Sequence, residues 1–382
     1  MRKIVLLALS ALFITALSAC ETSVEGDTYL LSNPYGDVEW DSVNHMLASL
    51  HSHTTHSDGA ATPDALVDLY EQQEYGALAI TDHDYMIDDD APIAYPWDAF
   101  SSINPEWEDR DSDAVGLIDI PGVEYSKAHH FVGLWTDVLK DYHPNHFDSD
   151  HEYLMTLMED IMEADEDALM FMAHPGRYTD DQYPVPEEGE YSLEWYMSLY
   201  DTYDALIGVE VFCGRNTHSL DRHLWEQLLV EYLPERPIWA LANDDFHGDD
   251  LNGFGRSKNI FLMDDETDED EFYRNLTEGR FYVEYTRQDL GYAPKIDAVT
   301  VDEAERTIEV EVEGDYDRIR WYGGYDYDGG SPELIKVGER FQYNDYEGDY
   351  IRAEVVYDEG GFEHAETVLQ PFTFTRDSDR QE

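Results

Sequence analysis

Short apolar runs recur through the first two thirds of the chain, and segments with helical spacing separate them. Each run ends at a polar residue or a turn signal, which is typical of buried strands. Residues 153–164 repeat leucine and methionine every three or four positions, and Pro63 suits the first turn of a helix over residues 63–74. The alternation of strands and helices predicts a parallel α/β domain. The predicted strands are residues 46–50, 77–81, 114–123, 169–173, 205–212 and 238–242.

The pattern changes at about residue 290, where apolar and polar residues begin to alternate one by one. Residues 308–312 read Ile-Glu-Val-Glu-Val, and turns that contain glycine follow at residues 328–330 and 358–361. A two-residue period is typical of antiparallel strands with one buried face. We therefore predict two domains, an α/β domain over residues 45–290 and a small antiparallel, Ig-like β-sandwich over residues 291–382.

Residues 1–19 are typical of an export signal, because Arg2 and Lys3 precede an apolar run over residues 4–17. That run is shorter than the roughly 20 apolar residues of a spanning helix, so no transmembrane helix is expected. Cys20 follows Leu-Ser-Ala, an ending that resembles the bacterial lipoprotein box, in which the cysteine carries a lipid. The alternative is an ordinary secretory signal with a chance cysteine.

The lipoprotein resemblance implies an exported protein that a lipid on Cys20 anchors to the cell envelope. Glu21 is not aspartate, so the anchor would lie in the outer membrane if the cell has one. Residues 20–44 are polar and contain glycine and proline, which predicts a tether before the first domain. With Cys20 lipidated, Cys213 is the one other cysteine, so no internal disulfide is expected and Cys213 is predicted to be a buried apolar residue.

The charge balance is extreme, because 86 Asp and Glu residues against 23 Lys and Arg residues give a formal net charge of −63. A field of this sign repels polyanions, so binding to long DNA, long RNA or anionic lipid surfaces is not expected. The composition favours solvation in a salty environment. The acidic clusters at residues 88–90 and 264–271 lack the spacing of a calcium loop and are predicted to be solvated surface.

His51 and His53 lie at the end of the predicted strand 46–50. In a strand, residues i and i+2 project from the same face, so these two imidazoles can face one cation. Alone, such a pair is weak evidence for a metal site, because histidine has many other roles. Further residues of metal-binding type follow later strands, and in parallel α/β barrels such side chains converge on one mouth. They are Asp58, His83, Glu124, His174, Asp245 and His247.

The motifs around these residues resemble the PHP (polymerase and histidinol phosphatase) family in order and context, over roughly residues 45–286. His130 is similar to the histidine that follows the motif glutamate in the phosphatase branch, and the neighbouring His129 leaves that assignment ambiguous. The resemblance implies an irregular (β/α)7 barrel with metal ions at its mouth. The motifs are His51-Ser52-His53, Ser57-Asp58-Gly59, Thr81-Asp82-His83-Asp84, Gly122-Val123-Glu124, Ala173-His174-Pro175 and Asp245-Phe246-His247.

The resemblance also implies a ligand set and a chemistry. Two to three divalent ions are expected, and mixed histidine and carboxylate shells suit zinc, manganese or iron better than calcium. Such ions activate water for the cleavage of a phosphate ester, and Asp245 or His247 would transfer the proton. The implied shells are His51, His53, Glu124 and Asp245; Glu124, His130 and His174; and Asp58, His83 and His247.

Further residues near the motifs bear on the substrate. Arg177 and Arg215 are candidate phosphate contacts, because few other cations lie near the motifs, and surface ion pairing is the alternative. Glu210 lies in a predicted strand where an apolar residue would pack, so it is expected to orient a ligand histidine. Residues 85–113 form a long connection with several aromatic residues, which fits a lid over the site.

Together these features predict a metal-dependent phosphoesterase that hydrolyses small phosphomonoesters or nucleotides. Its partners would be a small phosphorylated substrate and, through the lipid anchor alone, a membrane. Two alternatives stay open. The first is a metal-dependent hydrolase of another bond, such as an amide or a lactone. The second is a non-catalytic surface module in which the β-sandwich binds a glycan or a protein partner.

Overall fold

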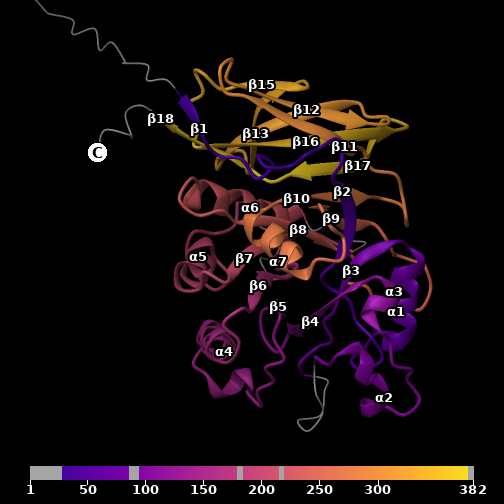
Figure 1. Cartoon of the computed structure of the whole chain (residues 1–382). Helices are drawn as coiled ribbons and strands as arrows, with labels where there is room; N and C mark the ends of the chain where they lie inside the picture. The colour runs from indigo at the N-terminus through magenta and orange to yellow at the C-terminus, as the bar shows by residue number, and fades with distance from the viewer. Residues whose placement is uncertain (1–27, 86–93, 179–183, 215–218, 377–382) are drawn as a thin grey trace, which may run out of the picture.

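The structure is a mixed α/β arrangement in which one large sheet runs through the molecule (Figure 1). The α/β part lies at one end and a β-rich region lies at the other. Cys20 and Arg215 lie outside the described residues, so their roles stay predictions. In the described part of the chain no helix is long and apolar enough to cross a membrane. The computed structural model describes residues 28–85, 94–178, 184–214 and 219–376.

The α/β part of the sheet has the strand order β10-β9-β2-β3-β4-β5-β6-β7-β8. Strands β2, β3 and β4 are parallel to one another, and so are β6, β7 and β8. Strands β5 and β9 are antiparallel to both of their neighbours. The strands are β2 (Asn44–Ser49), β3 (Tyr75–Ile80), β4 (Ile118–Tyr125), β5 (Phe131–Leu134), β6 (Leu169–Met172), β7 (Leu206–Cys213), β8 (Trp239–Asn243), β9 (Ser257–Met263) and β10 (Phe281–Thr286).

All six strands predicted for this part are present, and one of them has a shifted start. Strand β4 begins at Ile118 and not at residue 114, because Ser112–Val115 forms the short helix α3. Gly116 ends that helix in a left-handed conformation with φ +72°, which glycine adopts without steric strain. Strands β5, β9 and β10 are additional to the prediction.

The predicted helices are present and begin at the residues that favour a helix start. Helix α1 (Pro63–Gln72) has Pro63 in its first turn, and helix α4 (Asp150–Ala164) is capped by Ser149, whose hydroxyl accepts a hydrogen bond from the Glu152 amide. The other helical segments are α2 (Phe100–Ile103), α5 (Leu193–Thr202), α6 (Ser219–Tyr232), α7 (Glu269–Glu278), and the 3₁₀ turns η1 (Trp97–Ala99), η2 (Pro144–His146) and η3 (Pro175–Arg177).

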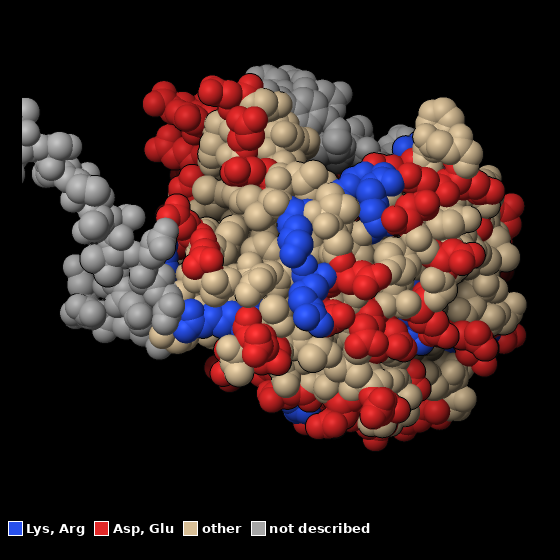
Figure 2. Space-filling model, turned by 90° about the horizontal axis from the view of Figure 1, so that it is seen from above, with Lys and Arg blue, Asp and Glu red and all other residues tan. Residues whose placement is uncertain are grey.

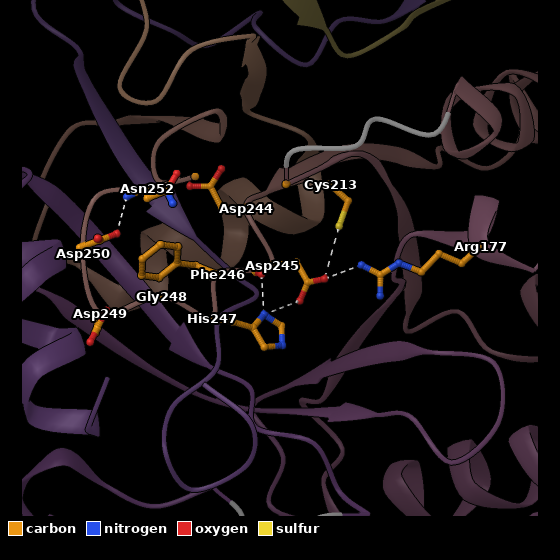
Figure 3. A pocket seen from close by; sticks show the side chains of 12 residues that line it. Arg177, Cys213, Asp244, Asp245, Phe246, His247, Gly248, Asp249, Asp250 and Asn252 are labelled. Carbon is orange, nitrogen blue, oxygen red and sulfur yellow. Dashed lines mark hydrogen bonds and ion pairs between the residues drawn. The ribbon is translucent and has the colours of Figure 1, made fainter. Parts of the chain in front are cut away.

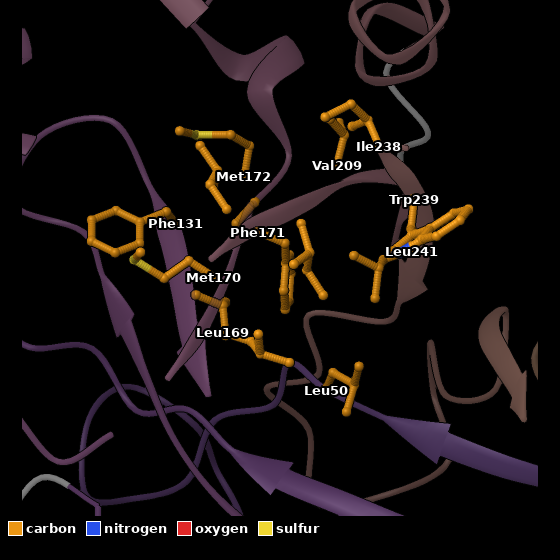
Figure 4. Packing of buried hydrophobic residues seen from close by; sticks show 14 of the residues in the cluster. Leu50, Phe131, Leu169, Met170, Phe171, Met172, Val209, Ile238, Trp239 and Leu241 are labelled. Atoms are coloured by element: carbon orange, nitrogen blue, oxygen red, sulfur yellow. The ribbon is translucent and has the colours of Figure 1, made fainter. Parts of the chain in front are cut away.

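The main hydrophobic core fills the space between these strands and helices (Figure 4). Leu50, at the end of β2, packs in the same cluster as Phe131 of β5, Phe171 of β6 and Leu241 of β8. These side chains are fully buried, and burial of apolar area is the main source of stability. The core therefore fixes the strand ends that carry the predicted metal ligands.

The β-rich region contains two groups of strands. A three-stranded sheet has the order β11-β12-β15, and the other strands extend the large sheet, with β13 and β17 beside β16 and β14 at an edge next to β13. A second hydrophobic cluster, which includes Trp321, Phe341 and Ile351, fills the region. The strands are β11 (Lys295–Asp302), β12 (Thr307–Glu313), β13 (Arg318–Asp326), β14 (Ser331–Val337), β15 (Arg340–Gln342), β16 (Tyr350–Glu359), β17 (Phe362–Leu369) and β18 (Phe372–Arg376).

The two parts are joined by backbone pairing and by buried ion pairs. Strand β10 pairs with β9 on one side and with β17 on the other, so the large sheet is continuous. Arg352 of β16 is fully buried, pairs with Glu226 of helix α6 and lies over the Trp225 ring at 5.2 Å. Arg222 of the same helix pairs with Glu354. Separation of helix α6 from β16 would leave these buried charges without partners, which is strongly destabilising. The ion pairs therefore hold the two elements together.

The predicted tether over residues 20–44 is wrong from Thr28 onward. Thr28–Ser32 forms strand β1, which pairs antiparallel with β18. Tyr35 is 2% exposed in the second core, where its hydroxyl donates to the Phe281 carbonyl at 3.1 Å and accepts from the Gln370 amide at 2.8 Å. The segment is mostly polar, so the sequence did not indicate that its few apolar side chains would be buried against strand β18 and the second core. This segment therefore belongs to the β-rich region.

The described part of the predicted lid, residues 94–113, is packed into the body of the protein. Tyr95, Trp97 and Trp107 are buried in a third hydrophobic cluster, which also contains Tyr70 of helix α1. These three aromatic residues are therefore core residues. The segment is long because it contributes an additional hydrophobic cluster. Residues 86–93 of the same prediction lie outside the described residues.

We predict that Tyr35→Phe destabilises the protein by about 1–3 kcal/mol, because the buried Gln370 amide and Phe281 carbonyl lose their partner. Chemical denaturation would measure the change in the free energy of unfolding. Tyr327→Phe is the matched control, since the exposed Tyr327 hydroxyl makes one 3.4 Å contact with Glu231. Equal stability of the two variants would contradict the assignment of residues 28–44 to the β-rich region.

We also predict that salt stabilises the fold. Acidic side chains are spread over the face seen in Figure 2, where Lys and Arg form a few separate patches, and the net charge of the chain is −63. Raising NaCl from 0.05 to 2 M screens this repulsion, so the melting temperature should rise by about 5 °C, equivalent to roughly 2 kcal/mol. Sucrose at matched osmolarity is the uncharged control. A melting temperature that is independent of NaCl would rule out charge repulsion as a major destabilising term.

Candidate metal centre

The predicted ligands meet at one edge of the large sheet. His51 and His53 follow β2, His83 follows β3, Glu124 lies near the end of β4, and His174 follows β6. Backbone contacts fix these segments against one another. The His53 amide donates to the Phe246 carbonyl at 2.9 Å, and residues His83 and Glu124 form an isolated parallel bridge. The remaining ligands at this edge are Asp58, His130, Asp245 and His247.

Four side-chain atoms form the central cluster. His51 Nε2 lies 3.4 Å from Glu124 Oε2 and 3.3 Å from Asp245 Oδ1. His53 Nε2 lies 3.3 Å and 3.0 Å from the same two oxygens. Ligands at roughly 2.0–2.1 Å around a tetrahedral ion are about 3.3 Å apart, so the spacing fits one transition-metal ion. All four atoms are buried and make no hydrogen bond of regular geometry among the described residues, although Glu124 Oε2 also lies 2.7 Å from His83 Nδ1.

The second cluster shares Glu124 with the first. Glu124 Oε1 lies 2.7 Å from His130 Nδ1 and 3.0 Å from His174 Nε2, while Oε2 faces the central cluster. His129 does not face the site, because its Nε2 lies 2.7 Å from the buried Tyr196 hydroxyl and its Nδ1 lies 2.9 Å from the His130 carbonyl. The structure therefore brings His130, and not its neighbour, to the predicted position.

The third cluster is more open to solvent. Asp58 Oδ1 lies 3.1 Å from His247 Nε2, 3.4 Å from His83 Nε2 and 4.0 Å from His53 Nδ1. The Asp58 side chain is 37% exposed and that of His247 is 34% exposed, whereas the central histidines are fully buried. All nine predicted ligands are thus brought together in the three predicted groups.

Glu210 of strand β7 contacts two of the predicted ligand histidines on the side away from the clusters. Its Oε1 lies 3.1 Å from His51 Nδ1 and accepts from the Asn243 amide at 3.0 Å, and its Oε2 accepts from the His174 backbone amide at 3.0 Å. A carboxylate on Nδ1 keeps the proton there and leaves Nε2 free to bind a metal. Glu210 thus contacts two of the predicted ligand histidines, which is the geometry that its predicted orienting role requires.

Two buried aspartates beside the ligands shape the loops, and the sequence reasoning missed both. Asp82 accepts from the Thr54 amide at 2.8 Å and from the Ser57 hydroxyl at 2.5 Å, which fixes the loop that carries Asp58. Asp244 accepts from the amides of residues 255–257 at 2.5–3.0 Å. Burial raises the pKa of Asp244 to about 6 against these hydrogen bonds. Asp82 directly precedes His83, and Asp244 directly precedes Asp245. This position next to a predicted ligand is the feature of the sequence that could have indicated a supporting role.

The charges of the clusters are strongly coupled. Burial raises the pKa of Glu124, but the His51 charge and hydrogen bonds from His130 and His174 hold it well below its usual value. Asp245 behaves in the same way, and His51 is the largest of the groups that lower its pKa. Although burial lowers the pKa of His51, the surrounding carboxylates raise it well above its ordinary value. Ionised carboxylates at this depth need positive charge, and a divalent cation would supply it.

A cavity of about 540 Å³ opens beside the clusters (Figure 3). Arg177 lines it and donates to Asp245 Oδ2 at 2.7 Å, so one oxygen of Asp245 faces the central cluster and the other faces the guanidinium. The Cys213 thiol lies 3.8 Å from the same oxygen, and burial raises its pKa well above the usual value. Cys213 is therefore a protonated, buried side chain, as predicted. Asp249, Asp250 and Asn252 line the opposite wall.

Three histidine and carboxylate groups, two of which share Glu124, lie at one edge of a largely parallel sheet and define a candidate multinuclear metal centre. Over 98 residues, or 24% of its length, the chain is 38% identical to the 5'-3' exoribonuclease Rnm of Escherichia coli (strain K12) and 36% identical to Rnm of Salmonella typhimurium. It spans 29% of the length of these curated relatives. No family model matches the chain.

Solved structures resemble the chain in fold. A two-domain protein from Bacteroides vulgatus that contains a predicted PHP-like metal-dependent phosphoesterase has a TM-score of 0.47 and 15% identity, over 90% of this chain and 98% of that chain. PsfC from Pseudomonas syringae has a TM-score of 0.40 and 15% identity, over 65% of this chain and 94% of that chain. The first of these structures is described as PHP-like, which is the family that the motifs of this chain resemble.

We predict that Glu210→Gln lowers metal affinity by about 10–100-fold. Glutamine keeps the volume and still accepts from the His174 amide, but its NH₂ group then faces His51 Nδ1 and moves the His51 proton to Nε2, the atom that faces the cluster. Competition with a chromophoric chelator would measure the affinity.

Glu284→Gln is the matched control, because Glu284 is buried on β10 and pairs with Lys258 at 2.9 Å away from the clusters. Both metal-free variants should unfold at similar temperatures. Unchanged metal affinity in Glu210→Gln would show that Glu210 does not set the tautomer of His51.

Proposed function

We propose that the protein is a metal-dependent phosphoesterase that hydrolyses small phosphomonoesters or nucleotides. The observation that carries this proposal is the central cluster, whose four ligand atoms are buried, converge on one point and make no hydrogen bond of regular geometry among the described residues. A cation at that point would neutralise the two buried carboxylates. The ligand types favour two to three ions of zinc, manganese or iron.

The residues of the centre have separate tasks in this proposal. Bound divalent ions would supply an activated water and would neutralise the phosphoryl oxygens. Glu124 holds the first and second sites together with its two oxygens, and Asp58 forms the third site with His83 and His247. Arg177 can donate to a phosphoryl oxygen from the cavity wall, because its guanidinium has further N–H groups beyond the one that contacts Asp245.

His247 is the better placed of the two candidates for proton transfer. Its Nδ1 donates to the Asp245 carbonyl at 2.8 Å, so Nε2, which faces Asp58 Oδ1 at 3.1 Å, would carry the proton in a form of the centre whose third site holds no ion. Asp245 is less suited, because Oδ1 faces the central cluster and Oδ2 accepts from Arg177. The side-chain exposure of 34% for His247 against 8% for Asp245 supports the same assignment.

The electrostatics favour a small substrate. Arg177 is the one Lys or Arg among the described residues that line the cavity, and Asp249 and Asp250 lie on the opposite wall. A nucleic-acid backbone needs a row of cations, because each neutralised phosphate contributes to affinity. A single terminal phosphoryl group needs only one cationic side chain, and Arg177 supplies it. The similarity to Rnm, an exoribonuclease, favours a second candidate, the release of nucleotides from the 5' end of RNA by the same ester chemistry.

We further propose that the strands of the α/β part close into the predicted irregular barrel. The side-chain amide of Asn259 on β9 accepts from the Ala242 amide at 3.0 Å and donates to the Ala242 carbonyl at 2.7 Å. This side chain thus takes the place of a backbone partner at the edge of β8. In the same proposal the β-rich region is a sandwich of its two groups of strands.

We also propose that the protein is exported and carries a lipid on Cys20, which would hold it at the cell envelope. The basic residues, the apolar run and the small residues before Cys20 support this proposal. Residues 20–27 would then be the tether, shortened by the pairing of β1 with β18. Labelling with a radioactive fatty acid in cells, and its loss in Cys20→Ala, would test the anchor.

We predict that the purified protein, loaded in turn with Zn²⁺, Mn²⁺ and Fe²⁺, releases phosphate from 5'-mononucleotides and p-nitrophenyl phosphate. The kcat/KM for a mononucleotide should exceed that for a 5'-phosphorylated RNA 20-mer by at least about tenfold, because the acidic cavity repels the longer polyanion. His51→Ala should lower kcat by at least roughly 100-fold and release metal, since the central cluster loses a ligand. His146→Ala, at an exposed turn, is the control.

Elemental analysis must accompany the assay, because it separates a failed reaction from an empty site. Full metal occupancy with no phosphate from any ester would overturn the proposal, and release from an amide or lactone panel would select the other hydrolase class. A preference for the 20-mer would select the exoribonuclease candidate. If neither chemistry occurs and His51→Ala keeps the biological role, the protein is a non-catalytic surface module.

A further inference from the structure

A second cavity, of about 380 Å³, lies in the β-rich region, remote in sequence from the metal ligands. It forms where the connection from β10 to β11, the turn after β12 and the hairpin between β16 and β17 meet. Its lining combines two aromatic rings with polar side chains of four kinds. These residues are Tyr292, Tyr357, Gln288, Asp315, Glu359 and His364.

Tyr292 offers an aromatic surface to solvent. Its side chain is 45% exposed, and its ring meets that of Tyr357 at a centroid distance of 5.4 Å and an angle of 83°. Phe362, which lies directly opposite Glu359 in the register of the hairpin, is 74% exposed, and Leu290 is also exposed. An exposed aromatic ring such as that of Tyr292 in the wall of a cavity is typical of a binding site.

The aromatic surface is held in place before any ligand binds. The Tyr292 hydroxyl donates to the Asp315 carbonyl at 2.8 Å. Gly314 has φ +91°, and a Cβ atom at this position would collide with the Tyr292 hydroxyl. Glycine is therefore required here both by the backbone conformation and by the close approach of the ring. Pre-organisation of this kind lowers the entropy loss on binding.

The polar lining suits hydroxyl groups. Asp315 and Glu359 offer carboxylate oxygens that accept, Gln288 can both donate and accept, and His364 Nδ1 lies 3.5 Å from Glu359 Oε2. No Lys or Arg side chain is among the described residues that line this cavity, so an anionic ligand would be repelled.

We infer that this cavity binds a neutral saccharide. The C–H face of a sugar ring packs on Tyr292, and its hydroxyl groups donate to Asp315 and Glu359 and accept from Gln288. An organic cation is the competing ligand. Carboxylates that would attract a cation are spread over the face seen in Figure 2 and are not particular to this cavity, whereas the Gln288 amide beside the exposed Tyr292 ring can donate to a ligand with acceptor oxygens.

The saccharide site is connected to the metal centre by a short path. The Leu290 amide donates to the Phe254 carbonyl at 2.9 Å, and Arg256 Nε donates to Asp289 at 2.6 Å. Phe254 directly follows Asn252 and Gly253, which line the metal-centre cavity. A glycan held at Tyr292 would thus be tethered beside the loop that forms one wall of the proposed catalytic cavity.

The test is isothermal titration of the full chain with four neutral probes: cellohexaose, maltohexaose, xylohexaose and chitohexaose. At least one should bind with a Kd of roughly 0.1–1 mM. Tyr292→Ala should weaken that binding at least tenfold, and Tyr292→Phe should weaken it by less than about threefold, because the ring supplies the contact and the bond to the Asp315 carbonyl only orients it. Tyr327→Ala removes another exposed tyrosine, which lies outside this cavity, and should have no effect.

The inference is overturned if none of the four probes binds, if Tyr292→Ala binds as tightly as the native chain, or if spermidine binds at the cavity in place of the sugars. Circular dichroism of Tyr292→Ala would confirm that the variant is folded. Phosphate release from a soluble mononucleotide should be the same in Tyr292→Ala and the native chain, so the outcome is independent of the proposed esterase activity.

Discussion

The buried carboxylate of Glu124 is the group on which the arrangement of the metal centre depends. One oxygen faces His51 and His53, and the other faces His130 and His174, so a single side chain spans two clusters. Its burial is unfavourable unless positive charge surrounds it, and this requirement draws the histidines from strand ends far apart in sequence to one place. The sheet brings the strand ends together, and the buried Glu124 carboxylate requires that the side chains at those ends be histidines or other groups that can carry or bind positive charge.

The surrounding residues restrict the freedom of this centre. Glu210 fixes the His51 ring and the His174 backbone together, while Asp82 and Asp244 hold the two loops that carry the outer ligands. His174 and Asp245 have positive φ values of 31° and 50°, conformations that non-glycine residues seldom adopt. Such strain persists only where neighbouring contacts compensate for it, and it is typical of functional sites.

The sequence was most informative where one local rule decided the structure. Residues 51 and 53 share a face in any strand, and His83, Glu124 and His174 come at the ends of predicted strands, whereas the full set of nine positions rested on the resemblance of the motifs to a known family. Strand β1 and the true extent of the second region could not be predicted, because the pairing of Thr28–Ser32 depends on β18, more than 300 residues later. Strand β5 is four residues long and contains Gly133, which gives little periodic signal. The choice between His129 and His130 required the position of Tyr196.

The extreme acidity of the chain and the proposed chemistry are mutually consistent. A net charge of −63 raises the local concentration of divalent cations and lowers that of polyanions near the surface. Within this field the centre concentrates histidines, and Arg177 is the single Lys or Arg side chain among the described residues of its cavity. The same charge that favours metal uptake therefore disfavours long nucleic acids. A substrate that carries one phosphoryl group on an otherwise neutral body meets both conditions, and a neutral glycan at Tyr292 would add binding without adding charge.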